Sequence, residues 1–271
     1  MRFSFDNFFI LLYNKNINVR EQDMRAEELI SAVSKLSEEK EKFEKLKKEI
    51  PLGEDAAGQV VTALKGGKPL TVRHIAVTGG GRSNFIRRLL VTISCLYERS
   101  EACFFILSPK IEYGELLRLK SMDATVPYIR THEDLEQALT TLRELIRIRE
   151  KQGTPRLILV LDGLEELAGH NKNGDFEEYR SIFDLLMRRE DIDVITGVDM
   201  QKSIFSGYPG AFAGIGNCLV STREEGKADV TYVQDDCSLS LPVLVTYPDT
   251  PSIMETIVFL NALGGGYEVS D

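Results

Sequence analysis

The sequence predicts an α/β fold, with a mostly parallel sheet that carries helices on both faces. Three observations lead to this prediction. Strand-like and helix-like segments alternate from residue 51 onward, which is the pattern of a parallel sheet with covering helices. Residues 156–161 form a nearly continuous apolar run, as in a strand buried on both faces. Three consecutive glycines, residues 79–81, join one expected strand to one expected helix.

The elements follow from local patterns along the chain. Apolar positions repeat at helical spacing after Thr131, which can cap a helix, and Glu133 and Asp134 follow in its positive first turn. Residues 52–55 are predicted to form a turn. The expected strands are 70–77, 102–107, 156–161, 193–197, 218–222, 229–234 and 239–247. The expected helices are 83–98, 112–120, a helix that starts near Thr131, 176–189 and 252–263.

The chain divides into three expected parts: an N-terminal extension at 1–50, one domain at 51–263, and a flexible tail at 264–271 that begins with three glycines. Residues 21–50 combine dense charges of both signs with a partial apolar seam and contain no Gly or Pro. We expect a long amphipathic helix there, ended at Pro51 and used for association rather than for the fold of the domain.

Composition excludes several classes of protein. The chain has 271 residues, with 33 Lys and Arg against 42 Asp and Glu, which gives a net charge of −9. An acidic chain is not expected to bind nucleic acid by itself. The apolar run at 8–13 is too short to span a membrane, and no signal-peptide pattern follows it. Four cysteines without a C-x-x-C pair indicate free thiols. We therefore predict a cytoplasmic protein, attached to a membrane complex through partners if at all.

The Gly-rich turn is the most informative motif. Backbone N–H groups of a glycine loop can converge on an anion, and the N-terminus of the following helix favours negative charge. The phosphate-loop motif G-x-x-x-x-G-K-[ST] is matched here at Gly81 and Ser83, whereas Ala76 and Arg82 replace the first Gly and the Lys. A simple tight corner and a dinucleotide fingerprint remain as alternatives. The predicted nucleotide-binding residues are Thr78, Gly79, Gly80, Gly81, Arg82, Ser83 and Asn84.

A second strand supplies the acid that a phosphate-loop domain needs. Residues 157–161 are apolar, and Asp162 stands at the carboxyl end of this run. In phosphate-loop enzymes such an Asp helps to hold Mg²⁺. We therefore expect Asp162, together with Ser83, to hold Mg²⁺ through water beside bound ATP.

With these motifs in place, the sequence resembles the FtsK/SpoIIIE group of P-loop motor ATPases, with a RecA-like core. The group includes DNA translocases and the EssC/EccC ATPases of type VII secretion. The resemblance covers roughly residues 50–263 and implies a translocation motor that binds ATP and Mg²⁺. The segments that carry it are 50–53, 77–83 as Walker A, 104–110, 159–167 as Walker B, and 240–245.

The sequence also departs from this family. Arg82 replaces the Walker A Lys, and Gly163 replaces the Walker B Glu that would orient the attacking water. Ser108 replaces the Asp of an Asp-Pro-Lys strand end. Asp199 stands near the position of the family's polar sensor, a Gln, and the Arg expected near residues 217–218 is absent. Weak or lost ATP hydrolysis follows from these replacements, because positioning and charge neutralisation are nearly all that such an enzyme contributes.

Two functions remain open at this point. One is an ATP-binding motor-type domain of a translocation machine, for proteins or for DNA. The other is a catalytically dead P-loop module that docks a substrate protein or regulates active sister ATPase domains. Glu165 and Glu166 could stand in for Gly163, although a solvated helix face is their ordinary role. The expected partners are proteins, and a ring of identical subunits is compatible with the family.

Overall fold

The structure is a computed structural model. It describes residues 44–45, 49–63, 74–97, 100–118, 123–127, 129–152, 155–163, 192–197, 218–223, 226–234, 237–245, 254 and 257. The predicted helix at 176–189, most of the N-terminal extension, the tail and nearly all of the closing helix lie outside these residues, and so do Glu165, Glu166 and Asp199.

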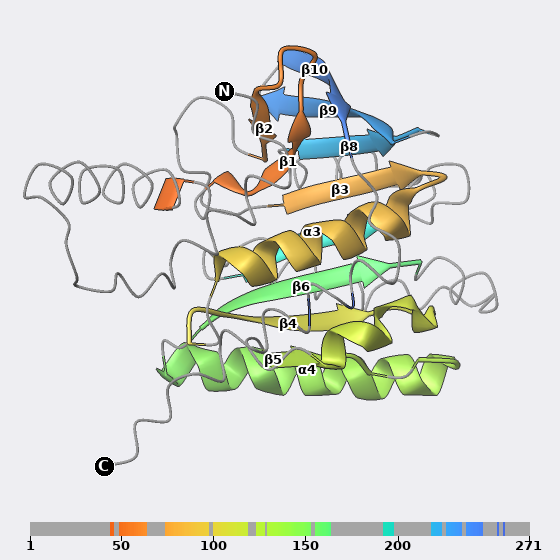
Figure 1. Cartoon of the computed structure of the whole chain (residues 1–271). Helices are drawn as coiled ribbons and strands as arrows, with labels where there is room; N and C mark the ends of the chain where they lie inside the picture. Colours follow the sequence, from red (N-terminus) through yellow and green to blue (C-terminus); the bar gives the residue numbers. More distant parts are fainter. Residues whose placement is uncertain are drawn as a thin grey trace, which may run out of the picture.

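The described strands form one sheet in the order β2-β1-β10-β9-β8-β3-β7-β6-β4-β5 (Figure 1). The six strands from β8 to β5 run parallel to their neighbours, and the remaining pairs are antiparallel. This confirms the predicted mostly parallel α/β sheet. The strands are β1 (Pro51–Glu54), β2 (Val60–Thr62), β3 (His74–Gly79), β4 (Ala102–Leu107), β5 (Asp123–Thr125), β6 (Arg156–Asp162), β7 (Ile192–Gly197), β8 (Cys218–Thr222), β9 (Lys227–Gln234) and β10 (Cys237–Leu244).

Two long helices cover opposite faces of the parallel part. Helix α3 (Arg82–Leu96) packs in one apolar cluster with Ile158 and Val160 of β6. Helix α4 (His132–Gln152) packs in a second cluster with Leu157 and Leu159 of the same strand. Alternate residues of β6 therefore enter different layers, as the two-residue period of a strand requires. A short 3₁₀ helix, η1 (Ile111–Arg118), follows β4.

The start of α4 matches its predicted capping. The Asp134 backbone N–H donates to Thr131 Oγ1 at 3.2 Å, and the Thr131 N–H donates to Asp134 Oδ2 at 2.9 Å. This reciprocal pair satisfies two donors that the helix itself leaves open. Hydrogen bonds from the backbone of Arg130 and Thr131 lower the pKa of Asp134.

The predicted turn at 52–55 is wrong, because residues 51–54 form β1 instead. Leu52 is fully buried, and the turn follows one step later, where Asp55 Oδ1 accepts from the N–H groups of Ala57 and Gln59. Gly53 suggested a turn, but its role is close packing: a Cβ there would stand 2.7 Å from the Leu244 carbonyl oxygen of β10. Glycine at this position admits the neighbouring backbone.

Three of the cysteines lie in the interior of the domain. Cys95, Cys103 and Cys218 are buried free thiols, and burial raises the pKa of Cys95 and of Cys218 to about 12. Among the residues that the structure describes, no helix combines the length and the apolar character needed to cross a membrane.

Candidate functional site: a phosphate loop beside a buried carboxylate

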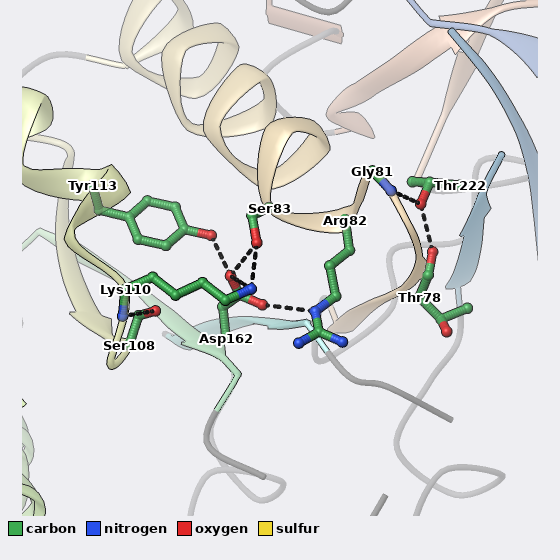
Figure 2. Close-up of polar contacts among 9 residues, drawn as sticks. All are labelled: Thr78, Gly81, Arg82, Ser83, Ser108, Lys110, Tyr113, Asp162 and Thr222. Atoms are coloured by element: carbon green, nitrogen blue, oxygen red, sulfur yellow. Dashed lines mark hydrogen bonds and ion pairs between the residues drawn. The ribbon is translucent and has the colours of Figure 1, made fainter. Parts of the chain in front are cut away.

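The glycine loop lies between β3 and α3 and is held by Thr222 at the end of β8 (Figure 2). The Thr222 hydroxyl donates to the Thr78 carbonyl oxygen at 2.7 Å and accepts from the Gly81 N–H at 3.2 Å. Gly79 has φ +100°, and a Cβ there would stand 2.1 Å from the Thr222 carbonyl oxygen. The loop therefore requires glycine at residue 79, both for its backbone conformation and for the close approach of β8.

The end of the loop leaves the N-terminus of α3 without a side-chain cap. Gly81 occupies the N-cap position, no side chain caps the helix, and its first turn contains no acidic residue. A Cβ at Gly80 would meet nothing within 4 Å, so the loop has open space on that side. Uncapped N–H groups and the helix dipole favour an anion at such an end.

Asp162, at the carboxyl end of β6, is completely buried and receives three hydrogen bonds (Figure 2). Arg82 Nε donates to Oδ1 at 3.2 Å, and Ser83 Oγ donates to Oδ2 at 2.8 Å. The hydroxyl of Tyr113, from η1, also donates to Oδ2 at 2.8 Å. A buried carboxylate requires such partners, because desolvation otherwise makes its charge costly.

Lys110 adds a second cation to this cluster. Its Nζ donates to Ser83 Oγ at 2.9 Å and lies 3.8 Å from Asp162 Oδ2. The Lys110 backbone N–H donates to the hydroxyl of Ser108, which is 3% exposed, at 3.1 Å. Ser108 therefore holds the backbone next to Lys110 without adding a negative charge. The carboxylate of Asp162 therefore faces two cations, Arg82 and Lys110.

Two further glycines shape the surroundings of Asp162. A Cβ on Gly197, at the end of β7, would stand 2.2 Å from Asp162 Oδ1. Gly163 has φ +73°, and its N–H donates to the Gly197 carbonyl oxygen at 3.2 Å. A glutamate at residue 163 would have to adopt this left-handed conformation, which costs roughly 1–2 kcal/mol for a residue with a side chain. The backbone conformation at residue 163 therefore favours glycine over glutamate.

The structure brings most of the predicted residues to one place. Arg82 and Ser83 contact Asp162, and Thr78 and Gly81 are joined through Thr222. Asn84 is exposed, and its side-chain oxygen accepts from Arg87 Nη1 at 3.4 Å.

Sequence analysis missed three members of the site. Thr222 carried no motif, and Tyr113 lay in an expected helix without a role. Lys110 had a usable signal, because it ends the segment at 104–110 that resembles a family strand.

The predicted magnesium ligands do not fit Mg²⁺ in this arrangement. Ser83 and Asp162 are hydrogen-bonded to each other, and the Lys110 ammonium lies against both of them. Mg²⁺ requires near-octahedral oxygen ligands and usually keeps several waters.

Together, the loop and the sheet define the class of protein. The loop strand β3 and the acidic strand β6 are parallel, and β7 lies between them. A glycine loop runs from β3 directly into α3, and a buried Asp ends β6. The chain has the P-loop NTPase fold, of the RecA-like type, as the sequence predicted.

Solved structures of type VII secretion ATPases share this fold. The cytoplasmic domain of EccC from Thermomonospora curvata has a TM-score of 0.57 and 12% identity, covering 80% of this chain and 31% of that one. The structure of EccC ATPases 2 and 3 from the same organism, in complex with a signal sequence peptide, has a TM-score of 0.51 and 15% identity. The match covers 70% of this chain and 42% of that one. EssC ATPases 2 and 3 from Geobacillus thermodenitrificans have a TM-score of 0.51 and 13% identity, covering 80% of this chain and 49% of that one.

These similarities concern the fold. The chain spans less than half the length of each of the three structures. No protein-family profile matches the chain, and no curated protein sequence matches it.

Proposed function

We propose that this chain is a nucleotide-binding P-loop domain of a protein-translocation machine of the type VII secretion kind. It is a degenerate copy of an FtsK/SpoIIIE motor domain that binds ATP weakly and hydrolyses it very slowly or not at all. The single observation that carries this proposal is the set of contacts on Asp162. The cation of the phosphate loop, Arg82, is directed to that carboxylate.

Nucleotide binding is supported by the loop. Gly79 and Gly80 place backbone close to the open side, and the N-terminus of α3 carries no acidic residue in its first turn. The positive charges of Arg82 and Lys110 at Asp162 add to the attraction for phosphate groups. Backbone N–H groups at a helix N-terminus are a general device for binding phosphate.

Three features of the site support slow hydrolysis. Arg82 cannot act as the compact charge that a Walker A Lys supplies, because its planar guanidinium has a different shape and already binds Asp162. Gly163 offers no carboxylate to orient water. The Ser83 hydroxyl donates to Asp162 and accepts from the Lys110 ammonium group. Each ~1.4 kcal/mol of lost transition-state stabilisation reduces the rate about tenfold, so several such losses lower turnover by orders of magnitude.

Binding of a fluorescent ATP analogue to two variants of Gly80 tests the nucleotide site. Gly80→Asp adds a negative charge where the structure has open space, and Gly80→Ser adds a similar bulk without charge. We expect the Asp variant to lose most of the binding and the Ser variant to keep it. Equal binding by both variants would place the nucleotide elsewhere. If the unmodified chain does not bind nucleotide, the docking module remains as the function, which the saturated Asp162 carboxylate also favours.

Phosphate release under ATP saturation tests the second half of the proposal. We expect turnover far below that of motor ATPases, and any residual turnover at this site should be lost in the Gly80→Asp variant. Turnover at ordinary motor rates would contradict the proposal.

The translocation role includes protein partners and a cytoplasmic position. The similar structure of EccC ATPases 2 and 3 holds a signal sequence peptide as the bound partner of that protein, and the acidic charge of this chain fits protein cargo better than DNA. The genes encoded beside this one discriminate further: secretion components with small helical substrates support the role, and recombination genes oppose it.

Residues 21–50, within the N-terminal extension, are proposed to serve association, including a ring of identical subunits. Deletion of residues 1–48 keeps the described contacts at the start of the domain. There the Ala63 N–H donates to the Glu49 carbonyl oxygen, and Ile50 is buried. We expect the truncated chain to unfold cooperatively and to associate less, as measured by thermal melting and analytical ultracentrifugation. Loss of the cooperative transition would make this segment part of the core.

A further inference from the structure

We propose that the ammonium group of Lys110 takes the place of Mg²⁺ in this site, so that nucleotide binding needs no divalent cation. The inference rests on the proposed nucleotide-binding function and deepens it. It concerns the chemistry of the bound form, namely metal-free nucleotide, and the residue that makes this form possible.

The contacts of Lys110 carry the inference. Its Nζ lies 2.9 Å from Ser83 Oγ and 3.8 Å from Asp162 Oδ2, and these are the two side chains predicted to hold Mg²⁺ (Figure 2). The Ser83 hydroxyl gives its hydrogen to Asp162, which leaves its lone pairs for the ammonium group. One cation of the protein thus contacts both groups that would otherwise contact the metal ion.

The surrounding contacts hold Lys110 in this position. Its backbone N–H donates to the Ser108 hydroxyl at 3.1 Å, and the Lys110 side chain is only 23% exposed. A neutral hydroxyl at residue 108 fixes the backbone without offering the ammonium group a competing carboxylate two residues away. The replacement of Asp by Ser at this position therefore directs the charge of Lys110 toward Ser83 and Asp162.

The two cations at Asp162 oppose a metal ion and favour an anion. Arg82 Nε lies 3.2 Å and Lys110 Nζ lies 3.8 Å from the Asp162 carboxylate. A divalent cation bound to this carboxylate would meet both like charges within a few ångströms, where repulsion in a partly buried site is large. The phosphates of a metal-free nucleotide carry the opposite sign to Arg82 and Lys110.

Titration of the full chain with a fluorescent ATP analogue tests this inference, once in EDTA and once in excess Mg²⁺. We expect binding in EDTA to be at least as tight as in Mg²⁺, because the site has no position for the metal ion and excess Mg²⁺ lowers the concentration of metal-free nucleotide. Binding only in the presence of Mg²⁺ would overturn this inference and leave the proposed function intact. Binding in neither condition would remove the proposed function and this inference together.

Lys110→Met sharpens the test, because it keeps a side chain of similar length and removes the charge. We expect metal-free binding to weaken by about 10- to 100-fold, the usual effect of losing a charge-assisted contact, and Mg²⁺ to restore part of it. Lys45→Met is the matched control, since Lys45 is exposed and pairs with Glu49 on its own helical turn.

Electron paramagnetic resonance of Mn²⁺ supplies a readout that does not depend on affinity alone. In the presence of nucleotide and protein, we expect the unmodified chain to add no bound Mn²⁺ beyond that held by the nucleotide itself. The Lys110→Met variant should add a bound signal, because Ser83 and Asp162 become available as ligands. Protein-bound Mn²⁺ in the unmodified chain would contradict the inference, and this result does not require the variant to fold.

Discussion

The two ends of strand β6 bury ionic groups in different ways. At the amino end, Arg156 forms a bidentate pair with Asp193 of the neighbouring strand β7, with contacts of 2.5 and 2.6 Å. At the carboxyl end, Asp162 is contacted from three separate segments: the start of α3, the segment after β4, and η1. Both carboxylates are almost inaccessible to water.

The difference between these ends separates a structural pair from a candidate binding site. Arg156 pairs with one carboxylate on the adjacent strand, whereas two cations, Arg82 and Lys110, meet at Asp162. Gly197 leaves room for the Asp162 carboxylate. Two cations beside an open glycine loop favour an anionic ligand, whereas the Arg156–Asp193 pair joins two strands.

Removal of each carboxylate should produce the largest effects on the free energy of unfolding and test most directly whether the two ends of β6 differ. Asp162→Ala leaves two cations beside a buried space, and we expect the free energy of unfolding to fall by about 3–5 kcal/mol. Asp193→Ala should cost less, roughly 1–3 kcal/mol, because the Arg156 side chain is 26% exposed and can be hydrated. Urea denaturation measures both. Equal losses would mean that the extra contacts of Asp162 add nothing.

The glycine loop provides the next test. Gly79→Ala places a Cβ against the Thr222 backbone at φ +100°, and we expect a loss of about 2–4 kcal/mol from strain and overpacking. Gly80→Ala meets nothing within 4 Å and should change stability by less than about 0.5 kcal/mol. Thermal unfolding of the two variants compares them at neighbouring positions. A similar loss of stability in both variants would indicate that any side chain in the loop is destabilising, whether or not it contacts β8.

The amino end of the sheet should respond to pH through His74. This residue lies at the start of β3, is 2% exposed and contacts Thr196 Oγ1 at 3.3 Å. Burial lowers the pKa of His74 from 6.5 to about 3. Between these values the unfolded chain binds a proton that the folded chain does not, so stability falls as the pH decreases from 6.5 toward 3.

His74→Gln removes this titration. At pH 5 we expect the His74 contribution to cost the unmodified chain about 2 kcal/mol relative to neutral pH, and the variant to lack that part of the acid sensitivity. Chemical denaturation of both proteins at pH 7 and pH 5 measures the difference. Parallel pH dependences would show that His74 accepts a proton within the folded chain.

The smallest expected effects come from two buried tyrosine hydroxyls. Tyr113→Phe removes a hydrogen bond to a carboxylate and should cost roughly 1–2 kcal/mol. Tyr232→Phe removes a hydrogen bond to the Thr62 carbonyl oxygen and should cost about 1 kcal/mol or less. The Tyr113 variant should also alter nucleotide binding, and the Tyr232 variant should not. A change of binding in both would indicate a general effect on the fold.

Local patterns in the sequence predicted much of the fold. Residues 102–107 and 218–222 are strands with the expected bounds, and α4 begins at the predicted cap. These elements depend on apolar runs, helical periodicity and capping, which act over a few residues and can be recognised in any sequence. Strands β1, β2 and β5 were not predicted, because each has only three or four residues and is stabilised by its partners in the sheet.

Some residues of the candidate site were likewise predictable from the sequence, and others were not. The sequence by itself determined the glycine loop, Ser83 and the acid at the end of β6, because glycines before a helix and an Asp after an apolar run are local signals. Only the tertiary structure decided that Lys110, Tyr113 and Thr222 join them. These three residues come from separate segments, and parallel strands place their carboxyl ends at one edge of the sheet regardless of the distance along the chain.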